Sequence, residues 1–101
     1  MLIHIENNIF DEVLSAKTAI VDFWAPWCGP CRTMGPIFEE FSDELEDESI
    51  VVAKVDVDKN MELAKKYGIN TIPSICIFKN GKALKKVVGV QSKNKLFELV
   101  K

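Results

Sequence analysis

Short runs of apolar residues alternate along the chain with segments in which apolar residues recur every three or four positions. The runs are rich in Val, Ile and Phe and are bounded by Gly, Pro, Asn or Asp, a pattern typical of β-strands. They predict strands over residues 2–5, 19–24, 50–58, 74–79 and 83–88.

The segments between these runs have the periodicity of amphipathic helices, because residues three and four positions apart share one helical face. The longest of them, from about residue 28 to residue 47, has an apolar stripe of Cys31, Met34, Phe38, Phe41 and Leu45. Polar residues that favour helix N-termini mark two other starts. These features predict further helices from a cap at Asn7 or Asn8 to about residue 17, over residues 60–67, and from a cap at Ser92 onward.

The resulting order of elements, β-α-β-α-β-α-β-β-α, indicates the fold class. A strand–helix–strand unit brings its two strands together in parallel through a right-handed crossover, and this applies to residues 19–24 and 50–58. Asn80-Gly81 is a hairpin signal that makes the last two strands antiparallel. We therefore predict one α/β domain over residues 1–101, with a mixed sheet of about five strands and helices on both faces.

Charge and hydropathy narrow the choice of partners. The formal net charge is −2. This argues against nucleic acid as a partner, because nucleic-acid binding depends on Lys and Arg side chains that neutralise phosphates. No stretch approaches the about 20 apolar residues of a membrane span, and residues 1–6 lack the features of a signal peptide. We expect a cytoplasmic monomer with neither a membrane nor a nucleic-acid partner.

Two cysteines lie where a predicted strand is followed by the long helix. Cys28 and Cys31 are separated by Gly29 and Pro30. A helix N-terminus offers unpaired N–H groups and the positive end of the macrodipole, and both favour the thiolate that attacks disulfides. Cys31 lies on the same helical face, at a separation that suits a disulfide. The spacing favours thiol–disulfide exchange over a pair of ordinary buried cysteines, with Cys28 partly exposed and Cys31 shielded.

The remaining cysteine and histidine do not complete a metal site. A structural zinc ion needs four ligands, and the chain offers one Cys-x-x-Cys pair, Cys76 and His4. We therefore expect no metal. Cys76 lies in an apolar strand and is interpreted as a small core residue, with a regulatory thiol as the less favoured alternative.

Two charged residues interrupt the predicted apolar strands. Asp22, between Val21 and Phe23, suggests either an alternating, half-exposed position or a strand covered on both faces. In the second case burial would raise the pKa of Asp22, and its carboxylate would accept a proton from Cys31. Lys54 interrupts the neighbouring strand, either as a partner of Asp22 or as a solvent-facing lysine.

Four stretches of the chain resemble the thioredoxin family. They are residues 21–31 (VDFWAPWCGPC), 52–58 (VAKVDVD), 67–74 (YGINTIPS) and 78–81 (FKNG). The order of elements agrees over essentially the whole chain. The resemblance implies the α/β thioredoxin fold, with a central mixed β-sheet of about five strands flanked by four helices.

The resemblance also implies roles for individual residues. Cys28 resembles the nucleophile, Cys31 the resolving thiol, Asp22 the buried acid behind them and Lys54 the lysine near that acid. Pro73 resembles the family's cis-proline. The substrate chain is expected on a rim of Trp27, Gly29, Pro30, Ile72, Pro73, Gly89 and Val90. Gln91 departs from the family pattern, in which a smaller or apolar residue is more familiar.

The activity implied is the reduction of disulfides in client proteins by the Cys28/Cys31 dithiol, with re-reduction by a thioredoxin reductase. No bound cofactor is expected beyond the redox-active disulfide Cys28–Cys31. Two alternatives remain at this point: an electron donor dedicated to one client, and a binding subunit in which the redox chemistry is incidental. Turnover of insulin disulfides separates the binding subunit from the other two.

Overall fold

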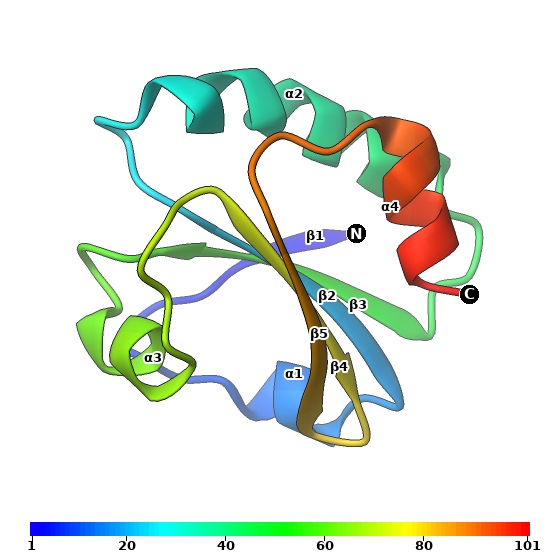
Figure 1. Cartoon of the computed structure of the whole chain (residues 1–101). Coiled ribbons are helices and arrows are strands. Elements are labelled where there is room, and N and C mark those ends of the chain that lie inside the picture. The colour runs from blue at the N-terminus through cyan, green and yellow to red at the C-terminus, as the bar shows by residue number, and fades with distance from the viewer.

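The computed structural model describes all of residues 1–101. Its strands and helices follow in the predicted order: β1 (Leu2–His4), α1 (Asp11–Ser15), β2 (Thr18–Trp24), α2 (Gly29–Glu44), β3 (Ile50–Asp56), α3 (Met61–Lys66), β4 (Ser74–Lys79), β5 (Lys82–Val88) and α4 (Lys93–Leu99). The strands form one five-stranded sheet in the order β1-β3-β2-β4-β5 (Figure 1). The predicted fold class is confirmed.

The sheet is mixed, and β2 lies at its centre. β2 and β1 are both parallel to β3, whereas β4 is antiparallel to both β2 and β5. Within this register Asp22 lies beside Lys54 of β3 on one side and Ile75 of β4 on the other. A charged pair is thereby placed in the middle of the sheet.

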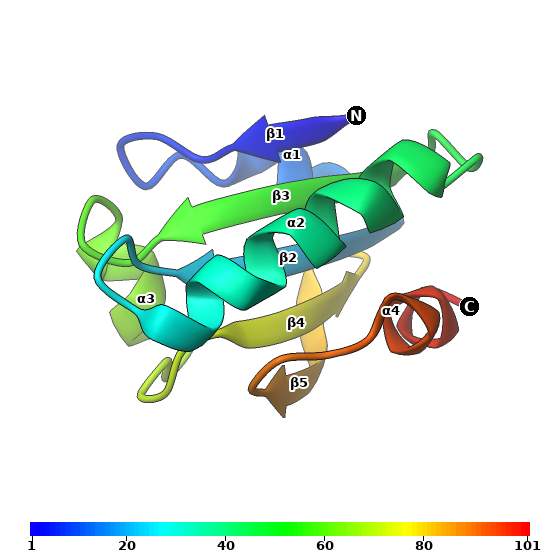
Figure 2. The same cartoon turned by 90° about the horizontal axis from the view of Figure 1, so that it is seen from above.

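Helices cover both faces, with α2 and α4 on one side and α1 and α3 on the other (Figures 1 and 2). Alternate residues of β2 enter different cores. Val21 and Phe23 pack with Phe10 and Leu63, whereas Ile20 packs with the buried side of α2 and α4. Asp22 is two residues from Ile20 on the same strand, so its side chain lies on the same face of the sheet and faces α2. None of the helices is both long and apolar enough to cross a membrane.

The prediction that Asn7 or Asn8 caps the first helix is wrong. Both residues have a positive φ, 53° and 58°, and α1 begins after Phe10 without a side-chain cap. Asn8 instead caps a different helix, because its Oδ1 accepts a hydrogen bond from the Leu63 N–H (3.2 Å) in the first turn of α3. The N–H of Asn8 in turn donates to Asn60 Oδ1 (2.9 Å), which ties residues 7–8 to the start of α3.

β1, α2 and β3 end one to three residues earlier than predicted: β1 stops at His4 rather than residue 5, and at or just after the end of each of the other two an Asp carboxylate bonds to the chain that follows. α2 stops at Glu44 rather than residue 47, and the C-cap residue Leu45 is already extended. In the turn before β3, Asp47 Oδ1 accepts hydrogen bonds from the N–H and Oγ of Ser49. β3 stops at Asp56 rather than residue 58, where Asp56 Oδ1 accepts the N–H of Asp58 (2.9 Å). Asp side chains compete with regular structure in this way.

The first helix is also shorter than predicted, since α1 ends at Ser15 rather than residue 17. The predicted position of α3 and the predicted cap of α4 are confirmed. Ser92 Oγ accepts the N–H of Lys95 (3.1 Å) at the start of α4. Gly68, with φ 63°, follows α3, and its N–H and that of Ile69 bond back to Lys65 and Ala64.

Candidate active site

Cys28 and Cys31 form a disulfide at the N-terminus of α2. Cys28 is the N-cap residue, and its Sγ accepts a hydrogen bond from the N–H of Cys31 (3.2 Å). Pro30 lies in the first turn, where the missing N–H costs no helical bond. The Cα atoms of the two cysteines are 5.2 Å apart, within the usual range for a disulfide. The helix start therefore provides both the N–H group and the geometry predicted for this pair.

The expected difference in exposure between the two cysteines is absent in the disulfide form. Cys28 is 5 % exposed and Cys31 4 % exposed. Cys28 is buried because Trp24, Ala25, Val57 and Ile72 pack around the pair. Shielding thus acts on both sulfur atoms and does not by itself distinguish an attacking from a resolving thiol.

The loop before β4 approaches Cys28 directly. Cys28 Sγ lies 3.7 Å from the carbonyl oxygen of Ile72, and the Ile72-Pro73 peptide bond is cis, as expected. The N–H of Gly89 donates to the carbonyl of Pro73 (2.8 Å). Three segments that are distant in sequence, around Cys28, Pro73 and Gly89, therefore meet at one end of the sheet.

The remaining residues of the predicted rim surround this meeting point and are open to solvent. Trp27 is 65 % exposed and Val90 43 % exposed, and Gly29 and Pro30 are also exposed. A Cβ added to Gly29 would meet nothing within 4 Å, so this glycine leaves open space beside the cysteines. Exposed residues of the predicted rim therefore lie next to the buried disulfide.

Asp22 is fully buried beneath α2, which decides between the two interpretations left open above. Both of its carboxylate oxygens lack a hydrogen-bond partner in the protein. Burial raises the pKa of Asp22 to about 6, and the positive charge of Lys54 offsets part of that rise. A carboxyl group with such a pKa exchanges protons near neutral pH.

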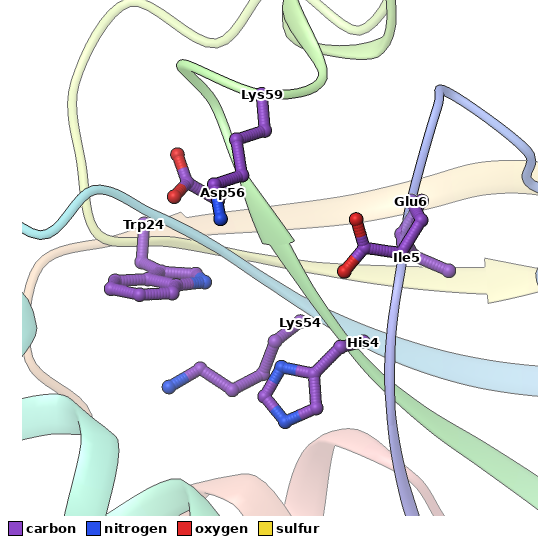
Figure 3. Close-up of a pocket in the computed structure, with 7 residues that line it drawn as sticks. All are labelled: His4, Ile5, Glu6, Trp24, Lys54, Asp56 and Lys59. Atoms are coloured by element: carbon purple, nitrogen blue, oxygen red, sulfur yellow. The ribbon is translucent and has the colours of Figure 1, made fainter.

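Lys54 is also buried, 8 % exposed, but its ammonium group lies against an aromatic ring rather than on the carboxylate. Lys54 Nζ is 4.6 Å from the centre of the Trp24 ring, a cation–π distance. Figure 3 shows the side chain extending beneath that ring, at a cavity of about 100 Å³ that His4 and Asp56 also line. A Cβ added to Gly35 of α2 would lie 3.7 Å from Lys54 Nζ, so α2 also approaches the ammonium group.

Asp58 is a further residue of the site, and local patterns did not predict it. Its Oδ2 accepts a hydrogen bond from Trp27 Nε1 (2.7 Å), which holds the exposed indole beside the disulfide. The signal for this contact was present. Trp27 follows β2 and Asp58 follows β3, and the carboxyl ends of adjacent parallel strands meet at one edge of the sheet.

Cys76 lies away from this site and is buried, 2 % exposed, among core residues, as predicted. Burial raises the pKa of its thiol to about 11. No group of three or more His, Cys, Asp or Glu side chains is placed to hold a metal ion.

Comparison with known proteins gives one consistent result. The family profile for thioredoxin matches residues 1–101. A thioredoxin of Rickettsia bellii is 45 % identical, covering 94 % of this chain and 90 % of its own length. A thioredoxin of Bacillus subtilis is 43 % identical, covering 89 % of each.

Solved structures agree with these relatives. The thioredoxin of Malassezia sympodialis superposes with a TM-score of 0.87 at 36 % identity, over 99 % of this chain and 88 % of that one. A mutant thioredoxin from Halobacterium salinarum gives a TM-score of 0.86 at 33 % identity, over 98 % and 87 %. With a profile that covers every residue and a disulfide at the Cys-x-x-Cys site, the chain belongs to the thioredoxin family and is a thiol–disulfide oxidoreductase that works through Cys28 and Cys31.

Proposed function

We propose that the protein acts in the reducing direction on protein disulfides, with Cys28 as the nucleophile and Cys31 as the resolving thiol. The observation that carries this assignment is the position of Cys28 Sγ, which receives the helix N-terminal N–H of Cys31 at 3.2 Å and lies 3.7 Å from the Ile72 carbonyl. The first contact stabilises a thiolate. The second lies where an extended client segment can pair with the backbone.

The reaction proceeds in two exchange steps. The Cys28 thiolate attacks one sulfur of the client disulfide; a Cys28–client bond forms, and the other client sulfur leaves as a thiolate that takes up a proton. Cys31 then attacks Cys28 Sγ, which releases the second client sulfur and forms the Cys28–Cys31 disulfide. Two electrons pass from the protein to the client, and a thioredoxin reductase restores the dithiol.

Asp22 is proposed as the acceptor of the Cys31 proton in the second step. It is a buried carboxyl with a pKa of about 6, so it is ionised at neutral pH and has no hydrogen-bond partner to compete for its lone pairs. Cys31 lies on the helix that covers it. Lys54, beside Asp22 in the register, is proposed to stabilise the ionised carboxylate.

The rim of Trp27, Gly29, Pro30, Ile72, Pro73, Gly89 and Val90 is proposed to bind the client chain. Its support is the convergence of these residues around the disulfide and the exposure of Trp27 and Val90. We further propose that residues 1–101 act as one monomeric domain in the cytoplasm. Size-exclusion chromatography with light scattering tests the monomer. Alkylation trapping of Cys28 and Cys31 in fractionated cells tests the compartment.

Reduction of insulin disulfides tests the proposed activity. With dithiothreitol as electron source, the protein is expected to accelerate insulin precipitation, Cys28→Ser is expected to lose this acceleration, and Cys76→Ala is expected to keep it. An inactive parent protein with an intact fold would overturn the proposal and favour a binding subunit. Reduction of one client protein but not of insulin would indicate a dedicated electron donor.

A further inference from the structure

Residues 88–91 connect the end of β5 with α4 and contain two residues of the proposed rim, Gly89 and Val90. Gly89 has φ 90°, a conformation that other residues rarely adopt, and its N–H donates to Pro73. Val90 follows and is 43 % exposed. The backbone conformation of this segment therefore decides where Val90 lies relative to Pro73 and Cys28.

The side chain of Gln91 bonds back to the segment that precedes it. Its Nε2 donates to the carbonyl oxygens of Val88 (3.2 Å) and Gly89 (3.1 Å). A primary amide has two N–H donors, which is the number required here. An apolar residue at this position would leave both carbonyls without this partner, so the unusual choice of Gln has a structural consequence.

The backbone of Gln91 is attached to the helix that carries the dithiol. Its N–H donates to Met34 Sδ (3.3 Å). Met34 is fully buried on α2, one turn beyond Cys31. The side chain of Gln91 therefore fixes the conformation of residues 88–91, and its main-chain N–H attaches this segment to α2.

These contacts leave the main-chain N–H and C=O of one residue free. The carbonyls of Val88 and Gly89 and the N–H of Gln91 are occupied, whereas the N–H and C=O of Val90 have no partner within the protein. Val90 is exposed on the same rim as Ile72. Main-chain groups of this kind are what an extended peptide uses when it pairs with a protein edge.

We propose that Gln91 is a positioning residue for protein substrates. Its side chain fixes the conformation of residues 88–91 and its main chain attaches them to Met34, so that the main chain of Val90 can pair with an extended client segment. This inference rests on the proposed function of the rim. A small disulfide with no flanking chain makes no use of Val90. Gln91 therefore affects the binding of proteins and leaves the chemistry at Cys28 unchanged.

The test compares two variants on two substrates. Gln91→Leu removes the side-chain donors at similar size, and Gln91→Arg restores N–H donors. We expect Gln91→Leu to raise KM for insulin about fivefold, as loss of two modest hydrogen bonds implies, with kcat within about twofold. The rate constant with bis(2-hydroxyethyl) disulfide should stay unchanged, and Gln91→Arg should return KM for insulin to near the parent value. Asn94→Leu, an exposed change on α4, is the matched control.

An unchanged KM in Gln91→Leu overturns the inference, as does an equal loss on insulin and on the small disulfide, or a failure of Gln91→Arg to restore KM. Trp27→Ala separates this from the rim proposal: if neither Trp27→Ala nor Gln91→Leu raises KM, the rim itself is wrong. If only Trp27→Ala raises it, the role of Gln91 alone is wrong. Hydrogen exchange at the Gly89 and Gln91 amides gives an independent measure. It should become about tenfold faster in Gln91→Leu, and an unchanged exchange rate contradicts the positioning role.

Discussion

Asp22 and Lys54 lie beside each other on β2 and β3, yet the ammonium group of Lys54 lies against Trp24, and the carboxylate oxygens of Asp22 have no hydrogen-bond partner. Burial therefore outweighs the attraction between the two charges, and the pKa of Asp22 stays near 6. The protein keeps a carboxyl group in its interior that gains or loses its charge close to physiological pH.

Asp22→Asn should stabilise the oxidised protein at pH 8 by about 3 kcal/mol. The carboxyl ionises near pH 3.8 in the unfolded chain but near pH 6 in the folded one, so the unfolded state loses this proton first as the pH rises. The cost to folding grows between these two values and is constant above the higher one, at about 1.4 kcal/mol per pKa unit. Urea unfolding at pH 8 and pH 4 measures the gain, which should shrink toward zero at pH 4.

Asp43→Asn, which removes an exposed carboxylate from α2, is the control for this measurement and should change stability little at either pH. Equal stability of the parent and Asp22→Asn at pH 8 would mean that the Asp22 carboxylate is fully compensated in the fold.

The same carboxyl group should appear in the pH dependence of the reaction. Proton transfer from Cys31 requires ionised Asp22, so the resolving step should accelerate as the pH rises through about 6. Asp22→Asn should lose this rise and be slower by about 100-fold at pH 7.5, the lower end expected for a general base. Rapid mixing of the reduced protein with a disulfide-containing peptide from pH 5 to 8 measures it. Identical profiles for parent and variant would remove Asp22 from the proton transfer.

Local patterns predicted the order of the elements, but they do not reveal a contact between residues distant in sequence. Asn8 shows this most clearly. Asn favours helix N-caps, but it also tolerates a positive φ, and nothing nearby in the sequence distinguishes the two. The deciding contact is with Leu63 of α3, and residues 8 and 63 follow β1 and β3, which lie side by side in the sheet.

In the site, too, features that depend on local sequence could be predicted, and features that depend on the pairing of strands could not. The thiol pair depends on residues 28–31 alone and could be predicted from their spacing. The direction of Lys54 toward Trp24 and the contact of Asp58 with Trp27 depend on the register between β2 and β3. The equal burial of Cys28 and Cys31 depends on Val57 and Ile72, which come from other strand ends. Side chains supplied by separate elements were the part that local patterns did not predict.

The two cysteines should differ in what they trap. In a Cys76→Ala background, Cys31→Ser should accumulate a stable mixed disulfide with a client through Cys28, because the resolving thiol is gone. Cys28→Ser should trap little. Non-reducing electrophoresis and mass spectrometry identify the linked residue. In the reduced parent, iodoacetamide should label Cys28 before Cys31; the opposite order would reverse the two roles.

Asn60→Ala should destabilise the protein by about 3 kcal/mol. Asn60 is fully buried, its Nδ2 donates to the carbonyls of Ile5 and Asp56, and its Oδ1 accepts the N–H of Asn8. Removing the side chain leaves these polar groups without their partner, at roughly 1–3 kcal/mol for each that stays buried. Urea unfolding measures the change, with the exposed Asn70→Ala as control. A loss no larger than the control's would mean that water replaces the amide.

The central position of β2 has a consequence for the redox cycle. β2 is hydrogen-bonded to β3 and β4 over nearly its whole length, whereas β1 and β5 form the edges. Strands enclosed in this way usually open only when the whole domain unfolds, while edges fray at little cost. The disulfide is thus joined to the segment with the longest-lived backbone. Client proteins can therefore bind and leave at the loops around Cys28 in each redox cycle while the hydrogen bonds of β2 stay intact.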